Sequence, residues 1–295
     1  MFSVVLPTVG GEHLKYAVRS VLRQSSAPNL VLVDDRRASG RDLRYACPEL
    51  EEVARLSVLV TGGVGLAGAR NIGLDEAGSA PVAFLDDDDV WCPHHLARVS
   101  DALSSPEAKG FAWSGSRVVT YGNGRAALTT AGFGWPNVFS ALQSTNVIPP
   151  SSAAVSSGRW VSFDQRRTEL EDWDAWLNLL RDGHEPSFTG VVTMGYGRNV
   201  ASKASMTMAA TADRSRQEAM ALSYEEICES HPVLEGAQDI RSAVREFRRL
   251  HAIQAETDDG LEFDYYELSV ESLFGRPSSP LCCDFDYAGA YLAES

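Results

Sequence analysis

Apolar and polar positions alternate along the first half of the chain in a way that predicts strands and helices in turn. Strands are expected where a short apolar run ends at proline, glycine or acidic residues, namely at 2–6, 30–33, 56–60 and 82–85. Helices are expected where apolar residues recur three or four positions apart, namely at 13–24, 41–55, 67–77 and 93–103. This alternation indicates an α/β fold with a mostly parallel central sheet and right-handed crossovers.

The second half of the chain has weaker strand patterns. We expect strands at 111–121 and 151–156 and helices at 169–181, 213–230 and 237–254. Residues 125–150 are expected to be irregular, and no strand is expected beyond residue 183. The last 40 residues are aromatic and acidic, and the pattern assigns them to no element. The chain is therefore predicted to divide into an α/β domain at 1–205 and a helical and aromatic region at 206–295.

Charge and cysteine content narrow the class of protein. The 295 residues include 26 Lys and Arg against 40 Asp and Glu, a formal net charge of −14, which argues against nucleic acid and anionic membrane surfaces as partners. No apolar run is long enough for a transmembrane helix, and the first residues lack the basic start of a signal peptide. Five cysteines without a CxxC pair fit a reducing compartment, so we expect a cytoplasmic protein. The adjacent Cys282 and Cys283 are interpreted as structural thiols, with a metal or redox pair as the alternative.

Four consecutive carboxylates, Asp86 to Asp89, follow the apolar run at 82–85 directly. Ligands bind at the carboxyl ends of strands in open α/β sheets, and four acids placed there repel one another. A divalent cation shared with substrate phosphates would relieve that repulsion. The alternative is a solvated acidic turn, which the apolar Val90 and Trp91 on the far side make less favourable. The run therefore predicts a metal–diphosphate site.

Five segments, in order and spacing, resemble the inverting GT-A glycosyltransferases of glycosyltransferase family 2. They are Val4-Val5-Leu6-Pro7-Thr8, Val31-Leu32-Val33-Asp34-Asp35, Ala69-Arg70-Asn71-Ile72-Gly73-Leu74, Phe84-Leu85-Asp86-Asp87-Asp88-Asp89-Val90-Trp91 and Glu171-Asp172-Trp173-Asp174. The resemblance implies that residues 1–205 form a GT-A, Rossmann-like nucleotide-sugar-binding domain. The helical region at 206–295 would then serve acceptor binding or oligomerisation, and its aromatic end is a candidate homodimer contact.

The resemblance also implies roles for the residues of these segments. The nucleotide would be contacted by Pro7, Thr8, Asp34, Asp35, Arg70, Asn71, Asp86 and Asp87. Asp88, together with Asp86, would bind Mn²⁺ or Mg²⁺ in the manner of a DxD motif. For Asn71, a polar contact within the fold is the alternative.

Asp172 would be the general base, because inversion requires one carboxylate to take the proton of the acceptor as it attacks. Glu171 would support it, and Trp173 would form part of the acceptor or sugar wall. The chain departs from the family downstream, where no histidine follows Tyr196 and Arg198. Arg198 and Lys203 are the candidate diphosphate contacts instead.

The expected function is a metal-dependent inverting glycosyltransferase that moves a sugar from a nucleotide diphosphate, expected to be UDP, to a soluble hydroxyl or amine acceptor. Residues 130–150 and the C-terminal helices would shape the acceptor side. One alternative is a non-catalytic protein that binds nucleotide sugars or carbohydrates. A sugar-phosphate nucleotidyltransferase is a weaker alternative, since residues 6–15 lack a glycine-rich basic phosphate loop.

Overall fold

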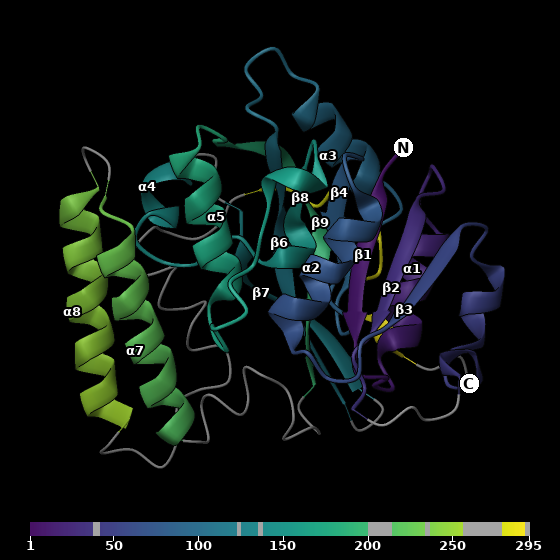
Figure 1. Ribbon diagram of the computed structural model, residues 1–295, viewed down its shortest axis with the longest axis horizontal. Helices are drawn as coiled ribbons and strands as arrows, with labels where there is room; N and C mark the ends of the chain where they lie inside the picture. The colour runs from purple at the N-terminus through teal and green to yellow at the C-terminus, as the bar shows by residue number, and fades with distance from the viewer. Residues whose placement is uncertain are drawn as a thin grey trace.

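The computed structural model describes residues 1–37, 42–122, 125–134, 138–199, 214–233, 237–255 and 279–292. Within these residues nine strands form a single sheet with helices packed around it, which confirms the predicted α/β class (Figure 1). The strands are β1 (Ser3–Thr8), β2 (Asn29–Asp34), β3 (Leu56–Val60), β4 (Val82–Phe84), β5 (Val90–Trp91), β6 (Phe111–Gly122), β7 (Arg125–Phe133), β8 (Ala153–Val155) and β9 (Pro186–Asn199). The helices are α1 (Leu14–Leu22), α2 (Leu66–Ala77), α3 (His95–Leu103), α4 (Phe139–Leu142), α5 (Glu171–Arg181), α7 (Arg214–Ser230) and α8 (Gln238–Ala255).

The sheet has the order β3-β2-β1-β4-β8-β6-β9-β5, with β7 paired to β6. The first four of these strands are mutually parallel, and β6 and β9 run in the same direction as they do. In the described part of the chain, β5, β7 and β8 are the antiparallel members. The sheet is therefore mostly parallel, as the alternation of strands and helices predicts.

The core lies on both faces of the sheet, because successive side chains of a strand point in opposite directions. On β1, Val4 and Leu6 join a hydrophobic cluster with α1 and α3, whereas Val5 joins a second cluster with α2 and α5. All six residues of β1 are buried. A central strand covered on both faces accounts for the continuous apolar run at 2–6.

The C-terminal helices α7 and α8 stand side by side at the end of the molecule opposite β3 (Figure 1). The Tyr224 ring of α7 stacks on Trp173 of α5 at a centroid distance of 5.2 Å. The Arg241 Nε of α8 donates a hydrogen bond to the Gln143 carbonyl at 2.8 Å. The predicted boundary near residue 205 lies outside the described residues, so the division into 1–205 and 206–295 stays a prediction.

The segment 279–292 returns to the sheet. The Val192 N–H of β9 donates to the Pro280 carbonyl at 2.8 Å, and the Cys282 N–H donates to the Val192 carbonyl at 2.9 Å. Tyr287 and Tyr291 are buried against β5, β6 and α1 in a third hydrophobic cluster. Part of the aromatic tail that the sequence pattern leaves unassigned is thus packed on the α/β domain.

Three expectations about elements are wrong. Residues 41–55 form no α-helix in their described part but two short 3₁₀ helices, Leu43–Tyr45 and Pro48–Glu52, because Pro48 removes a backbone donor. The range 125–150 contains β7, which pairs with β6 as a hairpin. The 14-residue β9 lies where no strand is expected, and its glycines disguise the strand pattern.

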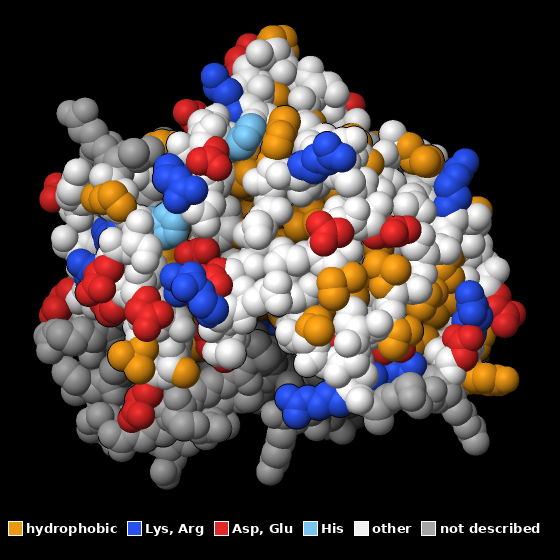
Figure 2. All heavy atoms as spheres, viewed as in Figure 1, with side chains coloured by type: hydrophobic (Ala, Val, Ile, Leu, Met, Phe, Trp, Pro, Cys, Tyr) orange, Lys and Arg blue, Asp and Glu red, His pale blue; other side chains and the backbone are white. Residues whose placement is uncertain are grey.

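The described helices include none that is long and apolar enough to cross a lipid bilayer. On the face shown in Figure 2, acidic and basic side chains are interspersed, and no continuous basic patch is visible.

Gly73 of α2 permits a close approach of this helix to β1. A Cβ atom added at Gly73 would lie 2.5 Å from Cγ1 of Val5, a fully buried residue of β1. We expect Gly73→Ala to lower the free energy of unfolding by about 1–2 kcal/mol, since overpacking exceeds the helix propensity gained. Gly68→Ala on the same helix is the control, because its Cβ would meet the exposed Val64 side chain, which can move. Denaturant unfolding measures both, and equal stability of the two variants would contradict the close-packing argument.

Candidate functional site

The carboxyl ends of β1, β2 and β4 meet at one edge of the sheet, and the acidic run Asp86–Asp89 follows β4 there. The Thr8 hydroxyl at the end of β1 donates a short hydrogen bond to Asp87. The Thr8 Oγ1 in turn accepts the Gly10 N–H at 2.9 Å. Parallel pairing places these residues together although 79 positions separate Thr8 from Asp87.

The acidic carboxylates have different surroundings. Asp86 accepts a hydrogen bond from Arg70 Nη2 at 2.7 Å, and Asp89 is 1% exposed and accepts the Gly197 N–H at 2.8 Å. Asp88 is half-buried, and in the described part of the chain no other side chain donates a hydrogen bond to its carboxylate. Asp88 is thus the member of the run whose charge is least compensated by the protein.

Burial and mutual repulsion raise the pKa values of Asp87 and Asp88. Burial raises the pKa of Asp87 to about 6, although the Thr8 hydrogen bond opposes it, and the Asp86 charge adds to the rise. Burial raises the pKa of Asp88 well above its usual range, and the charges of Asp87 and Asp86 add to the effect. Such a concentration of carboxylate oxygens suits a hard divalent cation, with Asp88 as the most available ligand.

The backbone of the acidic loop packs against β9 and against the C-terminal segment 279–292. A Cβ atom at Gly197 would lie 1.9 Å from the Asp88 carbonyl oxygen, so only glycine permits this approach. The Tyr291 hydroxyl donates to the same Asp88 carbonyl at 2.8 Å. The Tyr291 ring stacks on Tyr121 of β6 at a centroid distance of 4.2 Å. The backbone of the acidic loop is therefore fixed, whereas the Asp88 side chain is left available.

Arg70 of α2 connects the acidic loop to α5. Its guanidinium is 1% exposed and donates to Asp86 at 2.7 Å and to Glu171 at 2.6 Å. The guanidinium also lies 5.3 Å from the centre of the Phe163 ring. Because a charge buried this deeply must be paired, Arg70 fixes the N-terminus of α5 relative to the carboxyl end of β4.

Asp172 lies in the first turn of α5. Leu170, the residue before the helix, has a φ of 59°, a conformation that is costly for a branched residue and is found at functional sites. The carboxylate of Asp172 accepts hydrogen bonds from Asn146 Nδ2 at 2.7 Å and from the Trp173 N–H at 2.8 Å. Burial, followed by the Glu171 charge, raises the pKa of Asp172 to about 7, although Arg70 and Asn146 oppose the rise. A carboxylate with this pKa can accept a proton near neutral pH.

Two of the predicted nucleotide contacts make internal bonds in this structure. Asp34 forms a bidentate pair with Arg36, whose Nε and Nη2 donate at 2.8 and 2.6 Å. Asp35 accepts the Thr61 hydroxyl and the three N–H groups of residues 63–65. Burial acts to raise the pKa of Asp35, but these hydrogen bonds outweigh it and lower the pKa. Both residues shape the rim of the site, and their contacts with a nucleotide stay predictions.

Asn71 also bonds within the fold. Its amide donates to the Phe163 carbonyl at 2.7 Å and accepts the Phe163 N–H at 2.9 Å. This is the alternative given above for Asn71, a polar contact in the structure. It fixes residue 163 beneath Arg70, and a direct contact of Asn71 with a nucleotide stays a prediction.

The remaining predicted residues are spread over the fold. Pro7 is buried within β1 at the site edge. Trp173 is fully buried, and its Nε1 donates to the Leu142 carbonyl at 2.6 Å, which places the indole in the core. Arg198 is 1% exposed and lies over the Tyr196 ring. Lys203 lies outside the described residues.

Four residues at the site were not singled out by the sequence patterns: Asn146, Ser151, Gly197 and Tyr291. The Ser151 Oγ accepts the Asp86 N–H at 2.9 Å. Asn146 falls within the range 130–150 that we expect to shape the acceptor side, but nothing in its neighbourhood marks it. These contacts join positions far apart in the chain, so no spacing rule reveals them.

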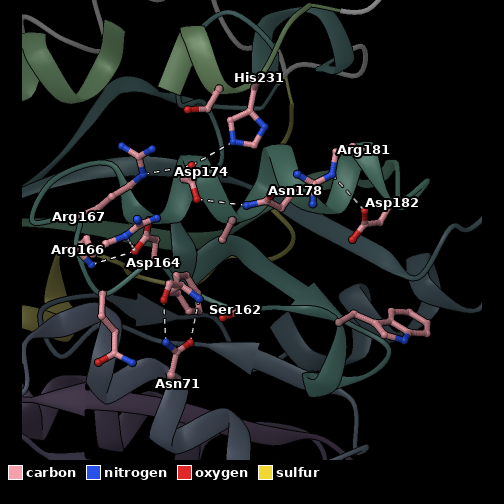
Figure 3. Close-up of a pocket in the computed structure, with 15 residues that line it drawn as sticks. Asn71, Ser162, Asp164, Arg166, Arg167, Asp174, Asn178, Arg181, Asp182 and His231 are labelled. Carbon is pink, nitrogen blue, oxygen red and sulfur yellow. Dashed lines mark hydrogen bonds and ion pairs between the residues drawn. The ribbon is translucent and has the colours of Figure 1, made fainter. Parts of the chain in front are cut away.

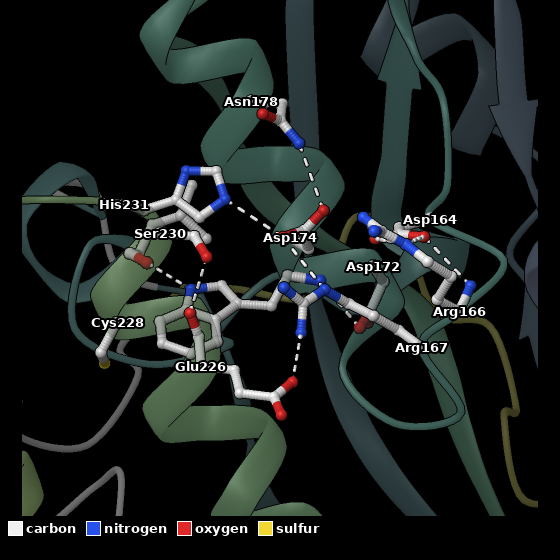
Figure 4. A network of polar contacts seen from close by, with 12 residues as sticks. Asp164, Arg166, Arg167, Asp172, Asp174, Asn178, Glu226, Cys228, Ser230 and His231 are labelled. Atoms are coloured by element: carbon white, nitrogen blue, oxygen red, sulfur yellow. Dashed lines mark hydrogen bonds and ion pairs between the residues drawn. The ribbon is translucent and has the colours of Figure 1, made fainter.

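A polar pocket of about 770 Å³ lies beside α5, lined by the segment 160–167, by α5 itself and by the end of α7 (Figure 3). Asp174 is at the centre of its network (Figure 4). It is bonded to Asn178 at 3.2 Å, to His231 at 3.1 Å and to Arg167 at 3.2 Å. Because two residues along a helix turn by about 200°, Asp174 faces away from Asp172. Asp172 is not among the lining residues, so this pocket and the acidic site lie on different sides of α5.

Curated relatives match short parts of this chain. The succinoglycan biosynthesis protein ExoW of Rhizobium meliloti is 35% identical over 111 residues, which are 36% of this chain and 35% of that protein. The Escherichia coli protein named UDP-Glc:alpha-D-GlcNAc-diphosphoundecaprenol beta-1,3-glucosyltransferase WfgD is 34% identical over 98 residues, or 32% and 38% of the two chains. The match thus spans about a third of the length of each of these relatives.

Solved structures share the fold. Residues 1–349 of TarS from S. aureus superpose with a TM-score of 0.58 at 16% identity, covering 85% of this chain and 72% of that one. The mannosyltransferase PcManGT of Pyrobaculum calidifontis, solved with GDP-Man and Mn²⁺, has a TM-score of 0.58 at 17% identity, covering 92% and 74%. At this identity the likeness concerns the fold, and it confirms the expected GT-A architecture.

The family described as Glycosyl transferase family 2 matches residues 3–163. The matched range contains the ends of β1, β2 and β4, Arg70 and the acidic run, which are the elements that build the site edge. Because this match covers more than half of the 295 residues, the chain belongs to glycosyl transferase family 2.

Proposed function

We propose that this protein is a metal-dependent inverting glycosyltransferase that uses a nucleoside diphosphate sugar, UDP-linked, as the donor. The observation that carries the proposal is the connection from Asp86 through Arg70 to the N-terminus of α5, where Asp172 has a pKa of about 7. This connection holds a proton acceptor beside a cluster of carboxylates that suits a metal. Family membership supports the reaction class.

Relatives support the class of donor. TarS has been solved with UDP-GlcNAc, PcManGT with GDP-Man and Mn²⁺, and the name of the E. coli relative contains UDP-Glc. We propose UDP as the nucleotide, because a carboxylate such as Asp35 at the end of β2 can accept the imide N–H of uracil. Pro7 and Thr8 would line the same nucleotide from β1, and Arg198 and Lys203 would contact its diphosphate.

The metal would be Mn²⁺ or Mg²⁺, held by Asp88 with Asp86 beside it. When bound, the cation neutralises the charge that develops on the departing diphosphate. The protein itself keeps this loop in place through Gly197 and Tyr291 and keeps Asp86 oriented through Arg70.

Asp172 would act as the general base. Its carboxylate is oriented by Asn146 and by the Trp173 N–H, and it would take the proton from the acceptor hydroxyl or amine during attack. Glu171 would keep Arg70 in place, and its charge helps to raise the pKa of Asp172 toward neutrality. One carboxylate suffices for inversion, since the leaving diphosphate is not protonated by the protein.

We propose a soluble acceptor, supported by the net charge of −14, which disfavours an anionic membrane surface. Asn146, which donates a hydrogen bond to the proposed base Asp172, would lie on the acceptor side. The region 206–295 would then take part in acceptor binding or in a homodimer contact.

Replacing Asp172 by Asn should remove the base and keep the shape of the site. We expect turnover to fall by on the order of 10²–10⁴, with donor affinity within about twofold of the wild type. Activity with UDP-sugars and a panel of acceptors, together with calorimetric donor binding, measures the two effects. If the wild-type protein binds the donor and the Asp172→Asn variant keeps full turnover, Asp172 is not the base. If the wild-type protein binds the donor but shows no turnover, the non-catalytic alternative is favoured.

Replacing Asn146 by Ala removes a hydrogen bond that stabilises the charged form of Asp172. The pKa of Asp172, about 7 in the wild type, should rise further, so the acidic limb of the kcat/KM profile should shift to higher pH. Asn178→Ala on the opposite side of α5 is the matched control, because Asn178 donates to Asp174. An acidic limb that is the same in all three proteins would show that Asp172 does not govern it.

A further inference from the structure

Three of the five cysteines converge behind the acidic loop. The sulfur atoms of Cys92, Cys282 and Cys283 all lie within 4.8 Å of one another, although 190 residues separate the first from the second. In the described part of the chain this is the one group of three or more potential metal ligands that meets this distance. All three thiols are free of disulfide bonds.

The backbone holds these cysteines in place. The Cys92 N–H donates to the Thr193 carbonyl at 2.9 Å, and the Cys282 N–H donates to the neighbouring Val192 carbonyl, also at 2.9 Å. Two consecutive carbonyls of β9 therefore fix two cysteines that lie far apart in the sequence. Cys92 is fully buried, whereas Cys282 and Cys283 are half-buried, which leaves one side of the group toward solvent.

We propose that Cys92, Cys282 and Cys283 form a binding site for one thiophilic divalent cation of the Zn²⁺ type. Tetrahedral zinc with Zn–S bonds of about 2.3 Å requires sulfur–sulfur separations of about 3.8 Å. From separations of at most 4.8 Å, the sulfurs need to close by about 1 Å or less. Water can complete the fourth position on the open side.

The surroundings favour a metal over a disulfide. A disulfide joins two sulfurs and leaves the third unused, whereas a soft cation uses all three. Three thiolates around a divalent ion leave one negative charge, and the Arg98 Nε, which donates to the Cys282 Sγ at 3.4 Å, compensates it. The chain thus supplies both the three sulfur ligands and the positive charge that balances them.

The site would fasten the C-terminal segment to the catalytic sheet. Cys92 follows β5, which continues from the acidic loop, and Tyr291 at the other end of the segment donates to the Asp88 carbonyl. A cation bound by the three thiols would therefore hold the segment 279–292 in place. Through Tyr291, this segment in turn holds the acidic loop at Asp88. This role is separate from the carboxylate metal site and does not depend on the proposed transferase activity.

Titration of the reduced full-length protein with Co²⁺ tests the proposal, because thiolate-to-cobalt charge-transfer absorption reports sulfur ligands and carboxylates produce none. We expect a band that saturates at one ion per chain and disappears when one equivalent of Zn²⁺ is added. Competition with a chromophoric chelator should show Zn²⁺ affinity lower by a factor of about 100 or more in Cys282→Ser and Cys283→Ser. Zn²⁺ should also raise the Tm of the wild type and not that of these variants.

Matched controls are available in the same chain. Cys47→Ser and Cys228→Ser alter buried cysteines outside the group and should keep the band, as should Asp88→Ala, which alters the carboxylate site. Absence of the band in folded wild-type protein, or a band unchanged in Cys282→Ser and Cys283→Ser, would overturn the proposal. Loss of two titratable thiols in protein purified without reductant, together with no Zn²⁺ affinity after reduction, would show a disulfide instead and would also overturn it.

Discussion

The candidate site depends on the buried Arg70 guanidinium and its two carboxylate partners. Asp86 belongs to the loop after β4 and Glu171 to the first turn of α5, and among the described residues only the Arg70 side chain bonds to both. Removing such a group from water costs several kcal/mol, so the pairs do not by themselves explain stability. Their effect is geometric, since Arg70 can be satisfied only when the acidic loop and the helix of Asp172 take one relative position. Loss of Arg70 would leave the Glu171 carboxylate buried without this ion pair.

Around this connection the chain concentrates negative charge that it does not neutralise. Arg70 donates hydrogen bonds to Asp86 and Glu171, and Thr8 donates one to Asp87. Asp88 has no comparable partner among the described side chains. Burial, followed by the mutual repulsion of the carboxylates, raises the pKa values of Asp87 and Asp88, and backbone contacts through Gly197 and Tyr291 prevent the loop from relaxing. A site of this kind gains most when a cation enters, which is the physical reason for associating it with metal-bound diphosphate.

Sequence patterns were sufficient for the framework and for the local motifs. The four parallel strands from β1 to β4 were predictable because each is a short, mostly apolar run, and Asp86–Asp89 because it follows one of these runs directly. β9 was missed because its three glycines, of which Gly197 is required for close contact with the acidic loop, resemble those of a loop. Asn146, Tyr291 and the group of three cysteines could not be predicted, since their partners are distant in sequence and are brought together only by folding. Asn71 shows the opposite difficulty. It belongs to a recognisable motif, but its amide bonds with the Phe163 backbone, so the motif alone does not tell a ligand contact from a structural one.

The measurement that tests the central claim most directly is calorimetric titration of the protein with UDP, in chelator and then with Mn²⁺. If Asp88 and its neighbours form a metal–diphosphate site, binding should be tighter by at least about tenfold with Mn²⁺, and Asp88→Ala should remove that gain. Asp42→Ala, which removes an exposed carboxylate, should keep it. UDP affinity that is the same with and without Mn²⁺, or absent in both conditions, would contradict the assignment of the acidic loop.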